Sequence, residues 1–189
     1  MVINEIHADP HADSPPAEPN GDANGDGTRD SSDDEFLEIV NISGNALDLG
    51  GWTIYDASGL RHTFPSGTIV SNTCSVVAFG GGTPTGIFDR SVVQTASVGY
   101  LGLNNGGDTV SIYDAQATAV ISYTYGSEGG NDQALTRDPD IAGSDPLVHH
   151  STATGSGGAL FSPGSMIDGT FFIGCPTVPL DPSIEKTGP

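Results

Sequence analysis

Residues 36–56 read FLEIVNISGNALDLGGWTIYD, and the pattern of this stretch indicates the fold class. Its two ends, 36–41 and 52–56, are rich in β-branched and aromatic side chains, which is the composition of β-strands. The residues between them are rich in Gly, Asn and Asp, which form tight turns at low steric cost. Short strands separated by short turns are typical of an antiparallel β-sandwich.

The same alternation of strand and turn continues on both sides of this stretch. Further strands are expected at residues 2–6, 62–64, 75–79, 109–113, 120–125, 133–137 and 169–173. The 27 Gly and 13 Pro interrupt every window that could hold a helix longer than about three turns. The sequence therefore predicts an all-β, immunoglobulin-like antiparallel β-sandwich with a long calcium-type loop insertion.

The chain is strongly acidic. Lys and Arg total 5 against 24 Asp and Glu, which gives a formal net charge of −19. Because such a charge repels the phosphate backbone, direct binding of nucleic acid is not expected. Insertion into a membrane is not expected either, since the sequence has no run of about 18 apolar residues.

A calcium-binding loop is predicted within the acidic insertion at residues 7–34. From Asp22 onward, oxygen side chains fall at loop positions one, three, five, nine and twelve, with glycine at position six. This is the ligand spacing of an EF-hand loop, in which position seven supplies a backbone carbonyl. Oxygen ligands without Cys or His favour Ca²⁺ over transition metals. The expected ligands are Asp22, Asn24, Asp26, Thr28 through its carbonyl, Asp30 and Asp33.

The flanks of this loop differ from those of an EF-hand. Pro15, Pro16 and Pro19 precede it and a strand follows it, so there is no helix pair for the ion to open. Position twelve holds Asp33, where sensor EF-hands use a bidentate Glu. A structural role for the ion is therefore expected. The alternative is an acidic loop that is only solvated.

Two carboxylates are expected to point the same way as core side chains. Glu38 shares a strand face with two expected core residues, and Glu5 shares a face with Ile3. A carboxylate in a core needs a partner, for which Arg61, Arg137 or a metal ion is available. The alternative is that both glutamates lie at exposed strand edges.

Cys74 and Cys175 are the two cysteines of the chain. They form no C-x-x-C motif and have no zinc-ligand spacing with the histidines. A disulfide between them is favoured, and two buried free thiols are the alternative.

Several blocks of the sequence occur in the order of a known family. They are VINEIH at 2–7, DEFLEIVN at 34–41, LDLGGWTI at 47–54, FPSGT at 64–68, LGLNNGGDTV at 101–110, QALTRDPD at 133–140 and FSPG at 161–164. Together they resemble the bacterial lamin-tail domain over roughly residues 1–176. The resemblance implies a compact immunoglobulin-like sandwich and brings no catalytic residues. The residues themselves predict Trp52 as a large buried anchor and a hairpin between Leu103 and Val110.

The resemblance also implies where the protein acts and which kinds of domain accompany it. Similar bacterial domains are appended to secreted nucleases, phosphatases and other surface hydrolases. The Pro-rich residues 177–189 are expected to be a linker toward a further domain. We therefore expect the chain to act outside the cell or on its surface, with the neighbouring domains of its own polypeptide as partners and with protein or glycan surface ligands as further candidates.

Catalysis by this chain is not expected. The bases of suitable pKa are His7, His11, His62, His149 and His150, and no nucleophile elbow or zinc-protease motif accompanies them. His149 and His150 are expected in an exposed loop. A transition ion bound by His7 and His11 is an alternative for these two histidines. The tyrosines could form a face that contacts glycans or proteins, although Tyr123 and Tyr125 alternate as half-buried strand residues would.

The sequence thus predicts a non-catalytic, calcium-stabilised interaction or targeting module of a larger secreted or cell-surface protein, such as a nuclease. An adhesive or carbohydrate-binding module is the alternative. A metal-dependent hydrolase is a further alternative.

Overall fold

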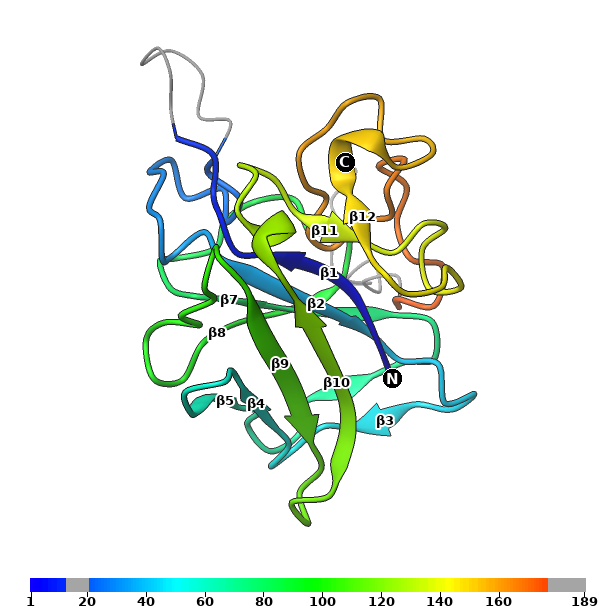
Figure 1. Ribbon diagram of the computed structural model, residues 1–189. Coiled ribbons are helices and arrows are strands. Elements are labelled where there is room, and N and C mark those ends of the chain that lie inside the picture. The colour runs from blue at the N-terminus through cyan, green and yellow to red at the C-terminus, as the bar shows by residue number, and fades with distance from the viewer. Residues whose placement is uncertain (13–20, 177–189) are drawn as a thin grey trace, which may run out of the picture.

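The computed structural model describes residues 1–12 and 21–176. The centre of the acidic insertion, residues 13–20, and the expected linker, residues 177–189, lie outside the described residues. The described part forms a six-stranded sheet, a four-stranded sheet and a small two-stranded sheet (Figure 1). The all-β prediction is confirmed.

The six-stranded sheet has the strand order β12-β11-β1-β2-β7-β8. Its strands are β1 Val2–His7, β2 Phe36–Val40, β7 Ser75–Phe79, β8 Val92–Thr95, β11 Leu135–Thr136 and β12 Val148–His149. The four-stranded sheet, in the order β10-β9-β4-β5, contains β4 Thr53–Tyr55, β5 Leu60–Thr63, β9 Asp108–Tyr113 and β10 Ala119–Tyr125. The two-stranded sheet pairs β3 Leu47–Asp48 with β6 Ile69–Val70.

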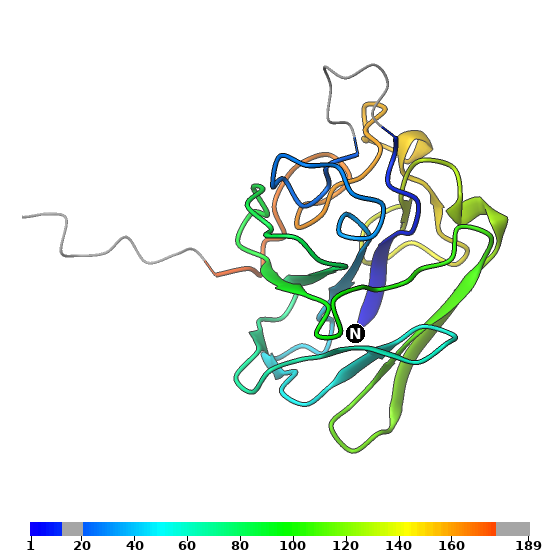
Figure 2. The ribbon, with the colours of Figure 1, turned by 90° about the vertical axis from the view of Figure 1, so that its left-hand side faces the viewer.

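The two large sheets enclose the main hydrophobic core. Leu37 and Ile39 of β2 are buried in it together with Ile54 of β4 and Ile112 of β9. Figure 2 shows the four-stranded sheet at the bottom, β1 and β2 in the middle, and the yellow and orange loops of the C-terminal part at the top. The six-stranded sheet is thus covered on both faces.

A second, smaller core lies on the outer face of the six-stranded sheet. Phe36 of β2 and Phe79 of β7 are buried there with Ala134, and Phe161 from the C-terminal loops packs against them. The sequence predicted core residues on only one face of β2. The structure buries all five residues of this strand, because loops cover the face that an ordinary sandwich would leave to solvent.

Helix is limited to two short 3₁₀ turns in the described ranges, η1 Ser127–Gly129 and η2 His150–Thr152. This agrees with the expectation that Gly and Pro exclude longer helices. None of the helices in these ranges is long and apolar enough to cross a membrane.

Some strands differ from the predicted set. The pairs β3 with β6 and β11 with β12 use strands of only two residues, too short to show a period in the sequence. Strand β8, which was not predicted, pairs with β7 in parallel, so the sandwich is not wholly antiparallel. The strand predicted at 169–173 is wrong. That segment makes one isolated bridge, Ser165 to Phe171, and Gly169 has a φ of 79° in a turn.

Two local predictions need correction. Trp52 is half-buried and packs against the core from its edge, whereas the fully buried anchors nearby are Leu49 and Phe64. The turn before β9 does not join two strands, because no strand ends at Leu103. The hairpin of this region instead joins β9 to β10 through the turn that begins at Asp114.

A disulfide joins Cys74 to Cys175, as favoured from the sequence. It connects the residue before β7 to the end of the described chain across a sequence separation of 101 residues. Both cysteines are buried at the margin of the main core. The disulfide therefore ties the C-terminal loops to the central strands of the six-stranded sheet.

Candidate functional site

The predicted calcium loop folds its side-chain oxygens onto its own backbone. Asp22 accepts hydrogen bonds from the N–H groups of Asp26 and Gly27 at 3.1 and 2.8 Å. Asn24 Oδ1 accepts from Asp26 N–H at 2.9 Å, and Asp26 Oδ1 accepts from Thr28 N–H at 2.9 Å. Gly27 at the sixth loop position has a φ of 91°, which suits the sharp turn that this position requires.

Two further carboxylates close the second half of the loop. Asp30 Oδ1 accepts from the N–H groups of Ser32 and Asp33 at 2.8 and 3.1 Å. Asp34 is buried and joins the two halves, because its Oδ1 accepts from Asn24 N–H at 2.9 Å and its Oδ2 from Asp30 N–H at 2.7 Å. Sequence reasoning missed Asp34, since the twelve-residue spacing ends one position earlier.

The loop packs closely against the segment that follows β7. Asn24 is buried, and its carbonyl oxygen accepts the N–H groups of Thr85 and Gly86 at 3.0 and 3.1 Å. A Cβ atom on Gly82 would lie 2.5 Å from Asn24 Nδ2 and 2.7 Å from Asp26 Oδ2. A larger residue at this glycine would therefore displace the two central side chains of the loop.

The carboxylates of the loop lie close enough to repel one another. Burial raises the pKa of Asp33, and the charges of Asp30 and Asp26 add to this. Burial, assisted by the charges of Asp22 and Asp26, raises the pKa of Asp34 to about 6. Without a cation, ionising these groups together costs free energy.

The loop's donors suit a hard cation in kind. A carboxylate oxygen that accepts one N–H retains a second lone pair for a metal ion. In residues 1–12 and 21–176, however, no three His, Cys, Asp or Glu side chains are clustered as metal ligands. A cation bound here would therefore also use the amide of Asn24 and the backbone carbonyl of the exposed residue Thr28. It would also draw the carboxylates of the loop toward itself.

A separate carboxylate cluster is buried between the first two strands and the C-terminal loops. Glu5 of β1 and Glu38 of β2 are register partners and are fully buried. Asn4 Nδ2 donates to Glu38 Oε1 and to Asp140 Oδ1, each at 2.9 Å, and Gly164 N–H donates to Glu38 Oε2 at 2.7 Å. The glutamates therefore lie among core residues, and the alternative of exposed strand edges is wrong.

Ser162 and His150 extend this cluster. Glu5 accepts hydrogen bonds from the Ser162 N–H at 3.0 Å and from its hydroxyl at 2.9 Å. Ser162 Oγ also lies 2.8 Å from His150 Nε2, and His150 Nδ1 lies 2.8 Å from the carbonyl of Ala159. All three side chains are buried, so this is a structural hydrogen-bond chain. The expectation that His150 is exposed is wrong.

Burial controls protonation in the cluster. Burial raises the pKa of Glu5 to about 8. It also raises the pKa of Glu38, to which the charge of Glu5 contributes, and that of Asp140. Burial lowers the pKa of His150. The folded protein thus favours a neutral Glu5 and a neutral His150 near pH 7.

Neither arginine that was considered as a partner of Glu38 approaches it. Arg61 of β5 pairs at 2.5 Å with Asp56, which directly follows β4. Arg137 pairs with Asp145 at 2.9 Å. Backbone and amide N–H groups satisfy the Glu38 oxygens instead, so an ion pair is not needed.

Among the residues that the structure describes, the remaining histidines do not form a metal site. His7 packs against the rings of Phe36 and Phe161, with centroid distances of 5.3 and 5.2 Å, and burial lowers its pKa to about 3. His11 Nδ1 lies 3.6 Å from Asp132 Oδ1. The described residues thus give no support to a transition ion shared by His7 and His11.

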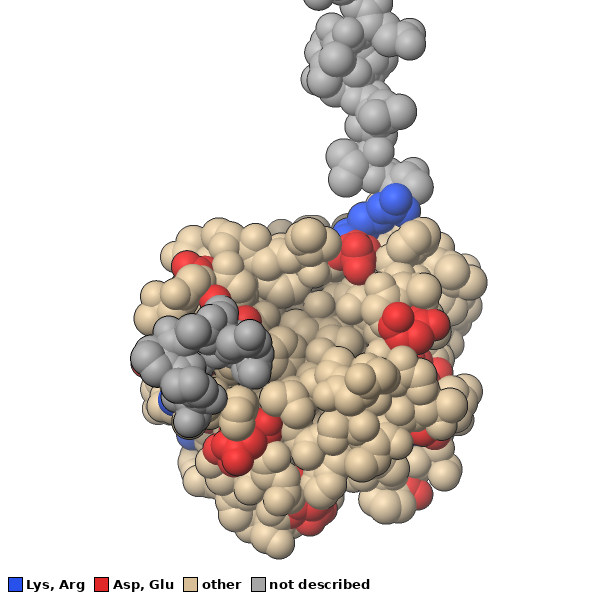
Figure 3. Space-filling view, turned by 90° about the horizontal axis from the view of Figure 1, so that it is seen from above, with Lys and Arg blue, Asp and Glu red and all other residues tan. Residues whose placement is uncertain are grey.

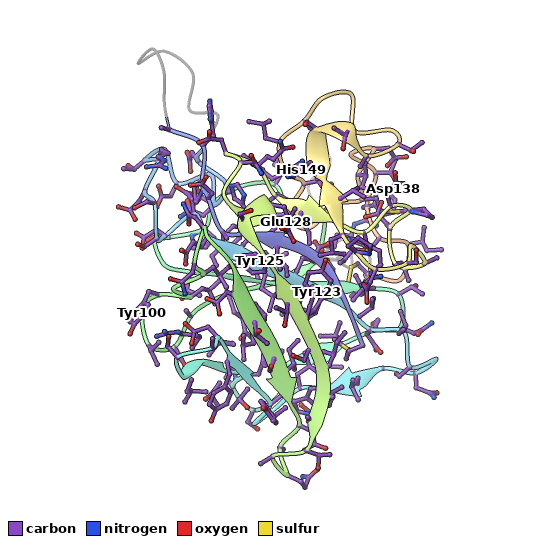
Figure 4. The ribbon with its side chains drawn as sticks, in the orientation of Figure 1. Tyr100, Tyr123, Tyr125, Glu128, Asp138 and His149 are labelled. Atoms are coloured by element: carbon purple, nitrogen blue, oxygen red, sulfur yellow. A yellow bond between two sulfur atoms is a disulfide. The ribbon has the colours of Figure 1, made fainter. Side chains whose placement is uncertain are left out.

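The five tyrosines do not share one face. Figure 4 shows Tyr123 and Tyr125 along β10 and Tyr100 apart from them on the left of the molecule. Tyr125 is buried, and Tyr123 is half-buried with its hydroxyl accepting the Leu147 N–H at 2.8 Å. Tyr55 and Tyr113 pair edge to face at 5.3 Å on the outer side of the four-stranded sheet.

The architecture is that of an immunoglobulin-like β-sandwich module. The model of the lamin tail domain family matches residues 1–127 of the 189 in the chain, and the chain therefore belongs to this family. The family is a non-catalytic, immunoglobulin-like one. No curated protein matches the chain.

The structure extends the sandwich beyond the matched residues. Strand β11 pairs with β1, with Glu5 opposite Thr136, and β12 continues the sheet beyond β11. The Ser162 and Gly164 hydrogen bonds to the buried glutamates bind the same region to β1 and β2. Residues 128–176 thus form one hydrogen-bonded body with the family-matched segment.

Proposed function

We propose that this chain is a calcium-stabilised, non-catalytic interaction or targeting module of a larger protein that acts outside the bacterial cell or on its surface. The observation that carries the proposal is the hydrogen-bonded acidic loop packed against an immunoglobulin-like sandwich. A cation would offset the repulsion among its carboxylates and hold the loop in one conformation. The ligands would be Asp22, Asn24, Asp26, Thr28 through its carbonyl, Asp30 and Asp33.

The covalent chemistry of the chain supports an extracellular setting. Both cysteines form a disulfide, and such bonds persist mainly in oxidising compartments. The resemblance to domains appended to secreted hydrolases supports a role beside a catalytic domain such as a nuclease. In that arrangement the module would position the neighbouring domain on a target.

Chelation is expected to lower the melting temperature. Bound Ca²⁺ would stabilise the folded state by about 2.7 kcal/mol at a hundredfold excess over Kd. For a chain of this size, that corresponds to a loss of roughly 5–10 °C when the ion is removed. The measurement is thermal unfolding in Ca²⁺ and in excess chelator.

Two variants make this test specific. Asp26→Ala should unfold at the same temperature in both buffers, because it removes a central ligand. Asp114→Ala is the matched control, since Asp114, like Asp26, accepts two backbone N–H groups in a turn but lies outside the loop. It should keep the difference between the buffers. The same melting temperature of the wild type with and without chelator would show that the loop is only solvated.

A further inference from the structure

We propose that the outer face of the sheet β10-β9-β4-β5 binds a neutral glycan. This inference rests on the proposed interaction function and names the surface and the ligand class that serve it. The face lies on the side of the sandwich opposite the acidic loop, because that loop packs through Ala23 into the small core beyond the six-stranded sheet.

Apart from Leu60, the outward positions of this sheet carry hydroxyl or aromatic groups. The charged side chain of β5, Arg61 at the bulge, is paired with Asp56. Alternation along the strands and the pairing register place on one face the side chains Thr53, Tyr55, Leu60, Thr63, Thr109, Ser111, Tyr113, Ser122 and Thr124. All of them are exposed or half-buried. In a chain of net charge −19, a four-stranded face without a carboxylate is a distinct surface.

Two pairs of hydroxyl groups are hydrogen-bonded across strands β9 and β10. Thr109 Oγ1 lies 2.8 Å from Thr124 Oγ1, and Ser111 Oγ lies 2.9 Å from Ser122 Oγ. Each hydroxyl has one donor and two acceptor sites, so a pair that shares one hydrogen bond still offers further donors and acceptors to a ligand. These hydroxyl pairs therefore form a polar platform, that is, a flat polar surface whose side chains are held in place by their own hydrogen bonds.

A tyrosine pair and a pocket lie beside this platform. The rings of Tyr55 and Tyr113 meet edge to face, with an interplanar angle of 75°. A pocket of about 170 Å³ is lined by both rings together with Thr53 and Ala117. Ala117 has a φ of 60°, a left-handed conformation that alanine rarely adopts, so the pocket wall is held at a cost in backbone strain.

A neutral sugar is the ligand that matches this chemistry. A pyranose ring presents apolar C–H groups that can stack on an aromatic ring, and hydroxyls that can exchange hydrogen bonds with Ser and Thr. A polyanion is disfavoured, because the net charge of −19 would repel it at long range. Figure 3 shows that Asp and Glu lie in several separate patches on the upper side of the molecule. A cationic partner would find no carboxylate on the face.

The test combines glycan binding with three variants. The folded, Ca²⁺-containing chain is applied to an array of neutral gluco-, manno-, galacto- and xylo-oligosaccharides, with sulfated and sialylated glycans as charged comparators. The affinity for the best neutral glycan is then measured by calorimetry. We expect Tyr55→Ala and Tyr113→Ala to weaken this affinity about tenfold or more. Tyr100→Ala, which removes an exposed tyrosine outside the face, should leave it unchanged.

Other results would overturn the inference. It fails if no neutral glycan binds, if only charged glycans bind, or if both β-strand tyrosine variants keep the wild-type affinity. It also fails if sedimentation shows a dimer that Tyr113→Ala dissociates, because a second copy would then cover the face. Asp26→Ala should bind the glycan normally. A chelator effect without glycan binding would overturn only the inference, and glycan binding without a chelator effect only the calcium proposal.

Discussion

Removing the disulfide with Cys74→Ala and Cys175→Ala together is expected to lower the free energy of unfolding by about 4 to 5 kcal/mol. The bond closes a loop spanning a sequence separation of 101 residues, and the chain-entropy model assigns this amount to a loop of about 100 residues. It also anchors the loops that bury Phe36 and Glu38. Chemical denaturation of the variant and the wild type gives the difference directly.

Reduction of the wild type provides an independent comparison. A reduced wild-type chain should show the same loss as the double variant, because both release the same loop. A loss below about 1 kcal/mol in both would mean that the C-terminal loops hold their place without the bond.

A rise of pH from 6.5 to 8 is expected to destabilise the protein through its buried carboxyl groups. The pKa of Glu5 is raised to about 8 in the folded state, so its stabilising contribution is complete below its ordinary value of 4.5 and is lost as pH rises through about 8. Each proton involved changes the free energy of unfolding by about 1.4 kcal/mol per pH unit. Glu5 alone therefore accounts for about 2 kcal/mol over this range.

The variant Glu5→Gln isolates this contribution. Its amide can donate to Ser162 Oγ, whose hydroxyl then turns toward His150 Nε2, so the hydrogen bonds of the site are kept. The free energy of unfolding should fall less steeply with pH in the variant than in the wild type, by the amount that corresponds to about one bound proton or more. More than one proton is expected where the pKa of Glu38 also falls, because the charge of Glu5 no longer raises it. Glu35 still contributes, since burial raises its pKa to about 8 as well.

The pH range is chosen to separate the carboxyl groups from the histidines. Burial lowers the pKa of His150, His62 and His7 below 6.5, so their contributions run in the opposite direction and level off within about one pH unit above that value. Parallel slopes for the wild type and Glu5→Gln would contradict a protonated Glu5 in the folded chain.

Much of the fold could be predicted from the sequence, because the longer strands carry clear patterns. Strands β1, β2, β7, β9 and β10 lie within a residue or two of their predicted positions. The short strands β3, β6 and β12 have no periodicity to detect, and their pairing depends on tertiary contacts. The error at 169–173 has the same origin: Phe171 and Ile173 resemble strand residues, but both are exposed beside a turn.

The candidate sites were predictable only where spacing within one segment carries the information. The spacing from Asp22 to Asp33 indicated the acidic loop, and the alternation around Glu38 indicated an inward carboxylate. The partners of Glu38 could not be predicted, because Gly164 lies 126 residues away in the sequence and donates through its backbone. The face around Tyr113 likewise depends on the register of four strands.

Calorimetric titration of Ca²⁺ into the chelator-treated chain measures whether a calcium ion binds to the acidic loop, as we propose. We expect a saturable heat with one ion per chain, present in the wild type and in Asp114→Ala and absent in Asp26→Ala. No heat in the wild type, or the same heat in Asp26→Ala, would show that calcium does not bind at this loop.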